Sequence, residues 1–209
     1  MNLINDLQWR HACKAMNGTR VPQEKVERIL EAINLTPTSL GMQAFKVLVI
    51  ENEQLKQRIY DEACQQQPIT ACSHLLVFTP YTEISEKFLD NYFDLIKRKR
   101  NPGEEWCKKY RAKIQGFMEK NRNGVESWLA HQVYIALGFA CVAAANERVD
   151  SVPIEGFDKE ALNRILDLPS KHLTSGIMLP LGYKDSEKDW INNTPKVRKE
   201  IADLIEVIK

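Results

Sequence analysis

The chain has 209 residues, of which 44% are hydrophobic and 27% charged, and its formal net charge is +1. This composition is typical of a globular protein, so it excludes a largely disordered chain and predicts a single domain over residues 1–209. Because the net charge is close to zero, the protein lacks the strong positive charge of a dedicated nucleic-acid-binding protein, and we expect no nucleic-acid partner.

The N-terminal sequence MNLINDLQWRH has no basic stretch followed by an apolar run, so we expect no secretory signal. The longest apolar run, VYIALGFACVAAA at 133–145, is shorter than the roughly 20 residues that span a bilayer and predicts a buried core helix. The five cysteines form no C-x-x-C pair, which favours reduced, mostly buried thiols. These features predict a cytoplasmic protein with no membrane contact.

The first periodic segment, PQEKVERILEAIN at 22–34, predicts an amphipathic helix with Pro22 at its first position. TPTSLGMQ, residues 36–43, interrupts the pattern with Pro, Gly and hydroxyl residues and is expected to be a loop. FKVLVI at 45–50 and HLLVF at 74–78 are short, apolar and rich in branched side chains, which indicates two buried strands. The sheet should therefore be covered by helices on both faces.

Asn52 is placed to cap a helix between these two strands. Residues 84–148 predict long helices, 158–166 a short helix and 173–183 a further strand, while the tail 191–209 holds a basic cluster and a last amphipathic segment. No repeat or linker separates these elements, so the expected fold class is α+β.

Residues 97–122 contain ten Lys or Arg against three Asp or Glu. A solvated helical face is the commonest reason for such a run. The aromatic residues within it, Trp106, Tyr110 and Phe117, are as compatible with core packing as with stacking on a ligand.

The segment RHACK, residues 10–14, concentrates basic side chains around a thiol before any periodic pattern begins. It could form a solvated basic corner, a phosphate clamp, a metal site or a Cys–His nucleophile. The chain has no C-x-x-C and no H-E-x-x-H, so a metal site would lack nearby ligands. Residues two apart, such as His11 and Cys13, do not face each other on a helix. A solvated basic corner and a phosphate clamp remain as interpretations of RHACK.

The chain lacks a G-x-G-x-x-G fingerprint, a P-loop and a G-x-S-x-G elbow. Four polar segments remain as candidates: RHACK, TPTSLGMQ, VPIEGFD at 152–158 and TPKVR at 194–198. Together with CQQQPIT at 64–70, they resemble, in order and over most of the chain, the oxygen-insensitive nitroreductase family.

This resemblance implies a nitroreductase-like α+β fold, in which a central mixed β-sheet is flanked by helices and two chains form an intertwined homodimer. It also implies an FMN-dependent oxidoreductase that takes electrons from NADPH or NADH, with FMN at the dimer interface contacted by both subunits. No catalytic side chain and no metal are implied, because the flavin carries the chemistry.

The resemblance places Arg10, Lys196 and Arg198 at the FMN phosphate, and Lys14 at the N1/O2 edge of the flavin. A guanidinium fork suits a phosphate, and a compact ammonium suits the charge that develops near N1. Ala12 stands where the family usually has Ser, so a hydroxyl contact is missing there. The remaining cofactor-binding positions that the resemblance implies are His11, Ala12, Pro37, Thr38, Ser39, Gly41, Gln65, Pro153, Ile154, Glu155 and Gly156.

Apart from His11 and Ala12 in RHACK, three segments carry these positions. The 36–43 loop is expected to reach the partner's flavin, the 152–158 loop to direct backbone N–H groups of Glu155 and Gly156 at N5 and O4, and Gln65 to contact the pyrimidine edge. Pro68 falls where the family has Lys, so one cation beside the flavin is absent.

The expected reaction is ping-pong transfer of hydride through flavin N5 to nitroaromatics, quinones or similar small acceptors, and the basic 97–122 segment is hypothesised to attract the 2′-phosphate of NADPH. Dehalogenation, flavin fragmentation and ring dehydrogenation are alternatives within the superfamily. Flavin binding without redox turnover is an alternative from another class, compatible with Ala12 and Pro68.

Overall fold

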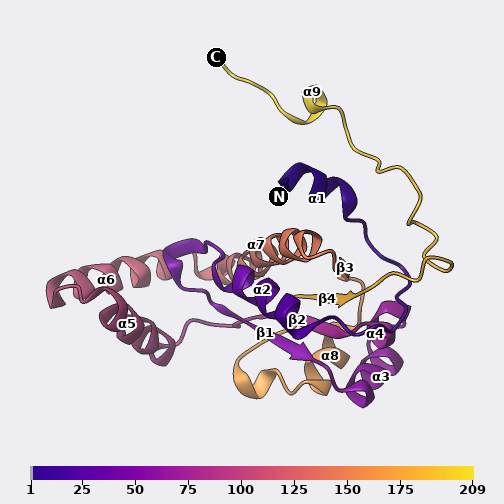
Figure 1. The fold of residues 1–209 in the computed structure, drawn as a ribbon. Helices are drawn as coiled ribbons and strands as arrows, with labels where there is room; N and C mark the ends of the chain where they lie inside the picture. Colours follow the sequence, from indigo (N-terminus) through magenta and orange to yellow (C-terminus); the bar gives the residue numbers. More distant parts are fainter. Residues whose placement is uncertain (1) are drawn as a thin grey trace.

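The computed structural model describes residues 2–209 and shows one β-sheet with helices on both faces (Figure 1). The strand order is β1-β2-β4-β3, and every pairing between these strands is antiparallel: β1 Phe45–Ile50, β2 His74–Pro80, β3 Asp150–Ser151 and β4 Ile177–Gly182. A parallel pairing occurs as an isolated bridge between Ala12 and Ser151. The α+β class is confirmed, and the mixed character of the sheet comes from this bridge alone within residues 2–209.

The helices in chain order are α1 Leu3–Trp9, α2 Gln23–Asn34, α3 Glu53–Glu62, α4 Gln67–Ala71, α5 Glu86–Arg100, α6 Glu104–Lys120, α7 Val125–Asn146, α8 Lys159–Ile165 and α9 Ile201–Leu204. Single 3-10 turns lie at Ser39–Gly41, Arg122–Gly124 and Pro169–Lys171. The predicted long helices between residues 84 and 148 are therefore α5, α6 and α7.

The core lies on both sides of β2, whose residues are all buried. Because side chains alternate along a strand, Leu75 and Val77 pack with residues of α3, α4 and α8, whereas Leu76 and Phe78 pack with α2 and α7. A third cluster, which includes Phe93 of α5, joins the inner faces of α5 and α6. The prediction of a sheet covered on both faces is confirmed.

The apolar run at 133–145 lies inside α7, which packs against α2 and the sheet. By length and composition the segment Arg122–Asn146 would suffice to cross a membrane, and 44% of its most apolar window is buried inside the protein. One face of α7 is buried in the core, as predicted. Tyr134, Ile135 and Phe139 on the other face are 38–42% exposed.

Some local predictions are confirmed and others are wrong. The Asn52 side chain accepts a hydrogen bond from Leu55 N at 2.8 Å, so the predicted cap exists. Pro22 precedes the first helical residue and is the N-cap, not the first position of α2. The tail forms only the four-residue α9, because its apolar side chains from Val197 onward pack against little among residues 2–209 and remain 58–91% exposed. The five cysteines are free, and four are buried.

Candidate functional site

The RHACK segment runs as an extended strap beside the end of the sheet. Cys13 N donates to Ser151 O at 3.3 Å, next to the bridge between Ala12 and Ser151. Further along, the Gln67 amide accepts from Met16 N at 2.8 Å and donates to Met16 O at 2.9 Å. The strap is therefore joined to the segment that leads into VPIEGFD and to the Gln-rich segment.

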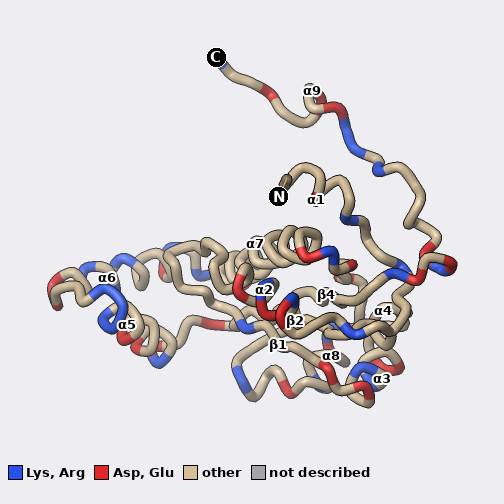
Figure 2. The backbone as a smooth tube through the Cα atoms, in the orientation of Figure 1, with Lys and Arg blue, Asp and Glu red and all other residues tan. Residues whose placement is uncertain are grey.

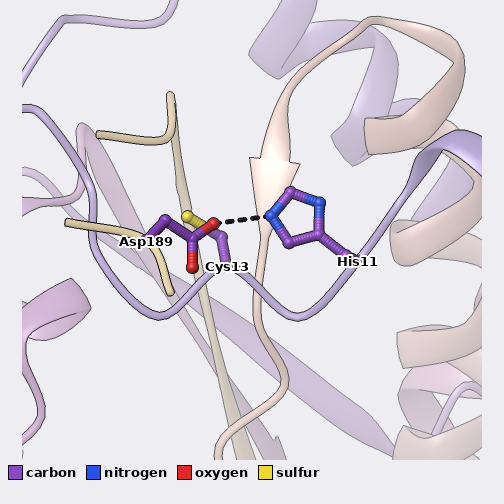
Figure 3. A group of neighbouring side chains, drawn as sticks. All are labelled: His11, Cys13 and Asp189. Carbon is purple, nitrogen blue, oxygen red and sulfur yellow. Dashed lines mark hydrogen bonds and ion pairs between the residues drawn. The ribbon is translucent and has the colours of Figure 1, made fainter. Parts of the chain in front are cut away.

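A buried carboxylate fixes the conformation of RHACK. Asp189 lies opposite His11 and Cys13 (Figure 3), with Oδ2 2.6 Å from His11 Nε2 and Oδ1 accepting from Lys14 N at 3.0 Å. The imidazole of His11 is thereby engaged with Asp189, although His11 was expected among the cofactor-binding positions. Asp189 belongs to the same loop as TPKVR, so it connects two of the predicted segments across 178 residues of sequence.

Ligand atoms of His11, Cys13 and Asp189 lie within 4.8 Å of one another, the spacing of a possible metal centre. Burial, and then the negative charge of Asp189, raise the pKa of the Cys13 thiol to about 12, and its Sγ donates to Ala15 O at 3.1 Å. The hydrogen bond from the thiol to Ala15 O and the bonds that Asp189 forms with His11 and Lys14 N account for the polar atoms of this cluster. The cluster is best described as a hydrogen-bonded tether.

Three cations converge where RHACK meets the tail. Loss of hydration lowers the pKa of Lys196, and the positive charges of Arg10 and Arg198 lower it further. Arg10 Nε is buried and has no hydrogen-bond partner among the described residues. A hollow of about 380 Å³ lies here, lined in part by Trp9, His11 and Lys196. Lys196 Nζ donates to Gln8 O, and Arg198 Nη1 donates to Val197 O at 2.7 Å. Arg10 Nε is therefore the buried nitrogen of this group that lacks an acceptor within residues 2–209, and a bound anion would supply one.

The VPIEGFD loop lies beside the Gln-rich segment. Ile154 bridges to Met178 of β4, and Asp158 N donates to Ala63 O at 2.8 Å. Glu155 and Gly156 at the tip are exposed, as is Gln65. Their positions leave the backbone of the loop and one amide side chain free to contact a ligand.

A second hollow, of about 330 Å³, lies between this loop and α7. The Tyr134 hydroxyl on α7 donates to Glu155 Oε1 at 2.5 Å across it. Burial raises the pKa of Tyr134 to about 12, and the hydrogen bond and charge of Glu155 contribute to the rise. The phenol is therefore a hydrogen-bond donor that holds the carboxylate, and not a proton acceptor.

The 36–43 loop lies elsewhere, at the α5–α6 end of the molecule (Figure 1). Ser39 N donates to the buried Gln132 side chain at 2.8 Å, and the hydroxyls of Tyr92 and Tyr110 donate to Leu40 O at 2.7 and 2.9 Å. Four of the five predicted segments are thus brought together at one end of the sheet, and Pro37, Thr38, Ser39 and Gly41 are not among them.

The sequence model of the nitroreductase family matches residues 7–183. The chain belongs to the nitroreductase family. It is 30% identical to a major NAD(P)H-flavin oxidoreductase of Aliivibrio fischeri, covering 99% of this chain and 98% of the relative, and 25% identical to an oxygen-insensitive NAD(P)H nitroreductase of Enterobacter cloacae, covering 98% and 99%. The resemblance predicted from the sequence is confirmed.

Solved structures show the same nitroreductase fold. A nitroreductase-like protein of Streptococcus mutans superposes with a TM-score of 0.85 at 20% identity, covering 99% of this chain and 98% of that one. A nitroreductase of Exiguobacterium sibiricum in complex with FMN superposes with a TM-score of 0.83 at 19% identity, covering 100% and 98%. The family match ends before Lys196 and Arg198, so the case for these two residues depends on the geometry.

The residues gathered in this nitroreductase fit FMN. The Arg10–Lys196–Arg198 group suits a phosphate, and Glu155 and Gly156 at the loop tip are exposed, which leaves their backbone accessible to a planar ring. The sequence did not point to Asp189 or Gln132, which hold RHACK and the 36–43 loop. Neither residue lies in a motif, so no signal in one sequence could have identified them.

Proposed function

We propose that this chain catalyses ping-pong transfer of two electrons from NADPH or NADH to nitroaromatics, quinones or similar electron-poor rings. Membership of the nitroreductase family makes it an NAD(P)H-dependent oxidoreductase with FMN as cofactor. When bound, FMN supplies hydride acceptance and two-electron delivery. The observation that carries the proposal is the cationic group at Arg10, Lys196 and Arg198, with its orphaned guanidinium nitrogen.

In this mechanism the protein binds, orients and supplies charge. Arg10, Lys196 and Arg198 would hold the FMN phosphate, and Lys14 would provide a cation at the flavin edge. Its backbone is already fixed by Asp189, so only the side chain must be ordered. Glu155 and Gly156 would offer backbone N–H groups to the ring.

Further contacts complete the proposed site. Gln65 would offer its amide to the pyrimidine edge. Only backbone or apolar contacts would come from Ala12, Pro153 and Ile154. Because Pro68 is buried in the first turn of α4 and carries no charge, Lys14 would be the main cation beside the ring.

We further propose that two chains form a homodimer and share each site, within one domain that spans residues 1–209. The exposed apolar face of α7 and the exposed tail residues support a partner chain, since such surfaces are usually covered. The position of the 36–43 loop, far from RHACK in its own chain, supports its reaching the partner's flavin (Figure 1). A cytoplasmic location is part of this proposal, supported by the reduced, buried thiols.

An anaerobic absorbance spectrum of the FMN-reconstituted protein tests the proposal. The flavin band at about 450 nm should bleach rapidly after one equivalent of NADPH. A bound flavin whose band persists, and no NADPH oxidation with an added quinone, would favour the binding-only alternative that Ala12 and Pro68 permit. A protein that retains no FMN would contradict the proposed site.

A further inference from the structure

A cavity of about 490 Å³ lies between the Ser39–Gly41 turn, α5 and α6. Its lining combines aromatic side chains with two cations: Tyr92, Trp106, Tyr110, Lys99 and Arg100. None of the cofactor contacts described above uses these side chains. The cavity therefore needs an explanation of its own.

The aromatic side of the cavity is exposed but held in place. Trp106 is 43% exposed, and its ring centroid lies 4.9 Å from that of Tyr110 with 31° between the planes. Tyr110 in turn donates to Leu40 O at 2.9 Å, which joins this wall to the 36–43 loop. An exposed, oriented indole is well suited to stack against another aromatic ring.

The basic side of the cavity is not neutralised. Lys99 and Arg100 are exposed in the last turn of α5 and form no ion pair within residues 2–209. By contrast, Arg111 on α6 is paired with Glu86 at 2.5 Å and Asp90 at 2.8 Å. Figure 2 shows Lys and Arg side by side at this end of α5 and along α6. Two free cations beside an exposed indole fit an anionic group on an aromatic ligand.

We propose that this cavity binds a ligand consisting of an aromatic ring and an anionic group, with the ring against Trp106 and the anion at Lys99 and Arg100. The inference rests on the proposed function, because Gly41 lines the cavity and belongs to the loop expected to reach the flavin. Two substrates of that cycle have this chemistry: an acidic aromatic acceptor and the phosphorylated adenosine of NADPH.

Isothermal titration of the FMN-bound, oxidised protein without NADPH measures binding with no turnover. One probe pair is 4-nitrobenzoate and 4-nitrobenzamide, which have similar shape and differ in charge. The second pair is 2′,5′-ADP and 5′-AMP, which differ by the 2′-phosphate. In at least one pair, the more anionic member should bind about fivefold more tightly. A charge preference in the first pair would identify an aromatic acceptor as the ligand. A charge preference in the second pair would identify the nucleotide as the ligand.

The variant K99Q/R100Q should lose this preference while binding of the less anionic member stays within about twofold. The matched control is K97Q/R98Q, which removes the same charge from the same helix but from a separate hollow lined by Asn91 and Asp94. Trp106→Ala should weaken both members of the pair, because it removes the stacking surface.

Equal losses in the two double variants would mean that only the general field matters, and would overturn the proposal. So would the absence of a charge preference in both probe pairs, or unchanged binding in Trp106→Ala. These titrations involve no hydride transfer. Their failure would therefore leave the NADPH bleaching result, and the proposed function, unaffected.

Discussion

Removing the Asp189 carboxylate should loosen RHACK and weaken FMN binding. In Asp189→Ala, Lys14 N loses a hydrogen bond of 3.0 Å and His11 Nε2 loses its partner at 2.6 Å. A hydrogen bond to a charged group contributes about 1.5–3 kcal/mol. Because two such bonds are lost and the His11 side chain is 13% exposed, we expect a loss of about 3 kcal/mol in the free energy of unfolding.

Urea unfolding without FMN measures this loss, and quenching of flavin fluorescence on titration gives the dissociation constant for FMN. The dissociation constant should rise about tenfold or more because the cations of RHACK are no longer held in place. This rise corresponds to a loss of about 1.4 kcal/mol in the free energy of FMN binding. Asp189→Asn keeps an acceptor for Lys14 N and should lose about half as much. The control is Glu187→Ala, an exposed residue of the same loop, expected to change stability by less than about 0.5 kcal/mol. If Asp189→Ala matched that control in both assays, the tether would have no role.

Three further predictions concern the flavin edge, the loop and the sheet. Lys14→Met should lower the flavin midpoint potential measured by spectroelectrochemistry, because it removes a cation; an unchanged potential would exclude Lys14 from the ring. Gly41→Ala should destabilise the protein by about 1–2 kcal/mol in urea, since Gly41 has φ +67° and a Cβ would meet the Tyr92 hydroxyl at 3.3 Å. Burial lowers the pKa of His74, so below about pH 6.5 the unfolded state binds more protons than the folded state. The free energy of unfolding should therefore decrease as the pH is lowered. His74→Gln should flatten that fall between about pH 7 and pH 5, and an identical slope in both proteins would assign it to other groups.

The elements that the sequence predicted well are those whose signal is local. The apolar runs at 45–50 and 74–78 formed strands at those positions, and β2 is buried throughout as predicted. The prediction of a buried strand is wrong for β1, which lies at the edge of the sheet and is buried only at Ile50. The cap at Asn52 needs only a side chain and a nearby N–H. The tail at 191–209 has a comparable amphipathic pattern but little helix, since short helices need tertiary packing that this chain alone does not provide.

The residues of the candidate site also differ in whether their signal is local. RHACK was identified because several basic residues stand together, whereas the acid that holds them, Asp189, is a single residue in a charged loop. Its role depends on a contact across 178 residues, and on burial that nothing in its neighbours indicates. The Gln-rich segment shows an intermediate case. Gln67 is exposed but hydrogen-bonded to Met16, which leaves the exposed Gln65 as the amide that is not held by this strap.

The separation of the 36–43 loop from the other segments bears on how the site is completed. Gln132, Tyr92 and Tyr110 fix the backbone of this loop from α7, α5 and α6, so it cannot fold back toward RHACK without losing three hydrogen bonds. A loop so rigidly held contributes to a flavin site only if that site belongs to another chain. The exposed apolar residues of α7 and the tail are the surfaces on which such a chain would pack. The same rigidity would hold the cavity beside Trp106 at a fixed position relative to the partner's flavin, which is what a substrate site requires.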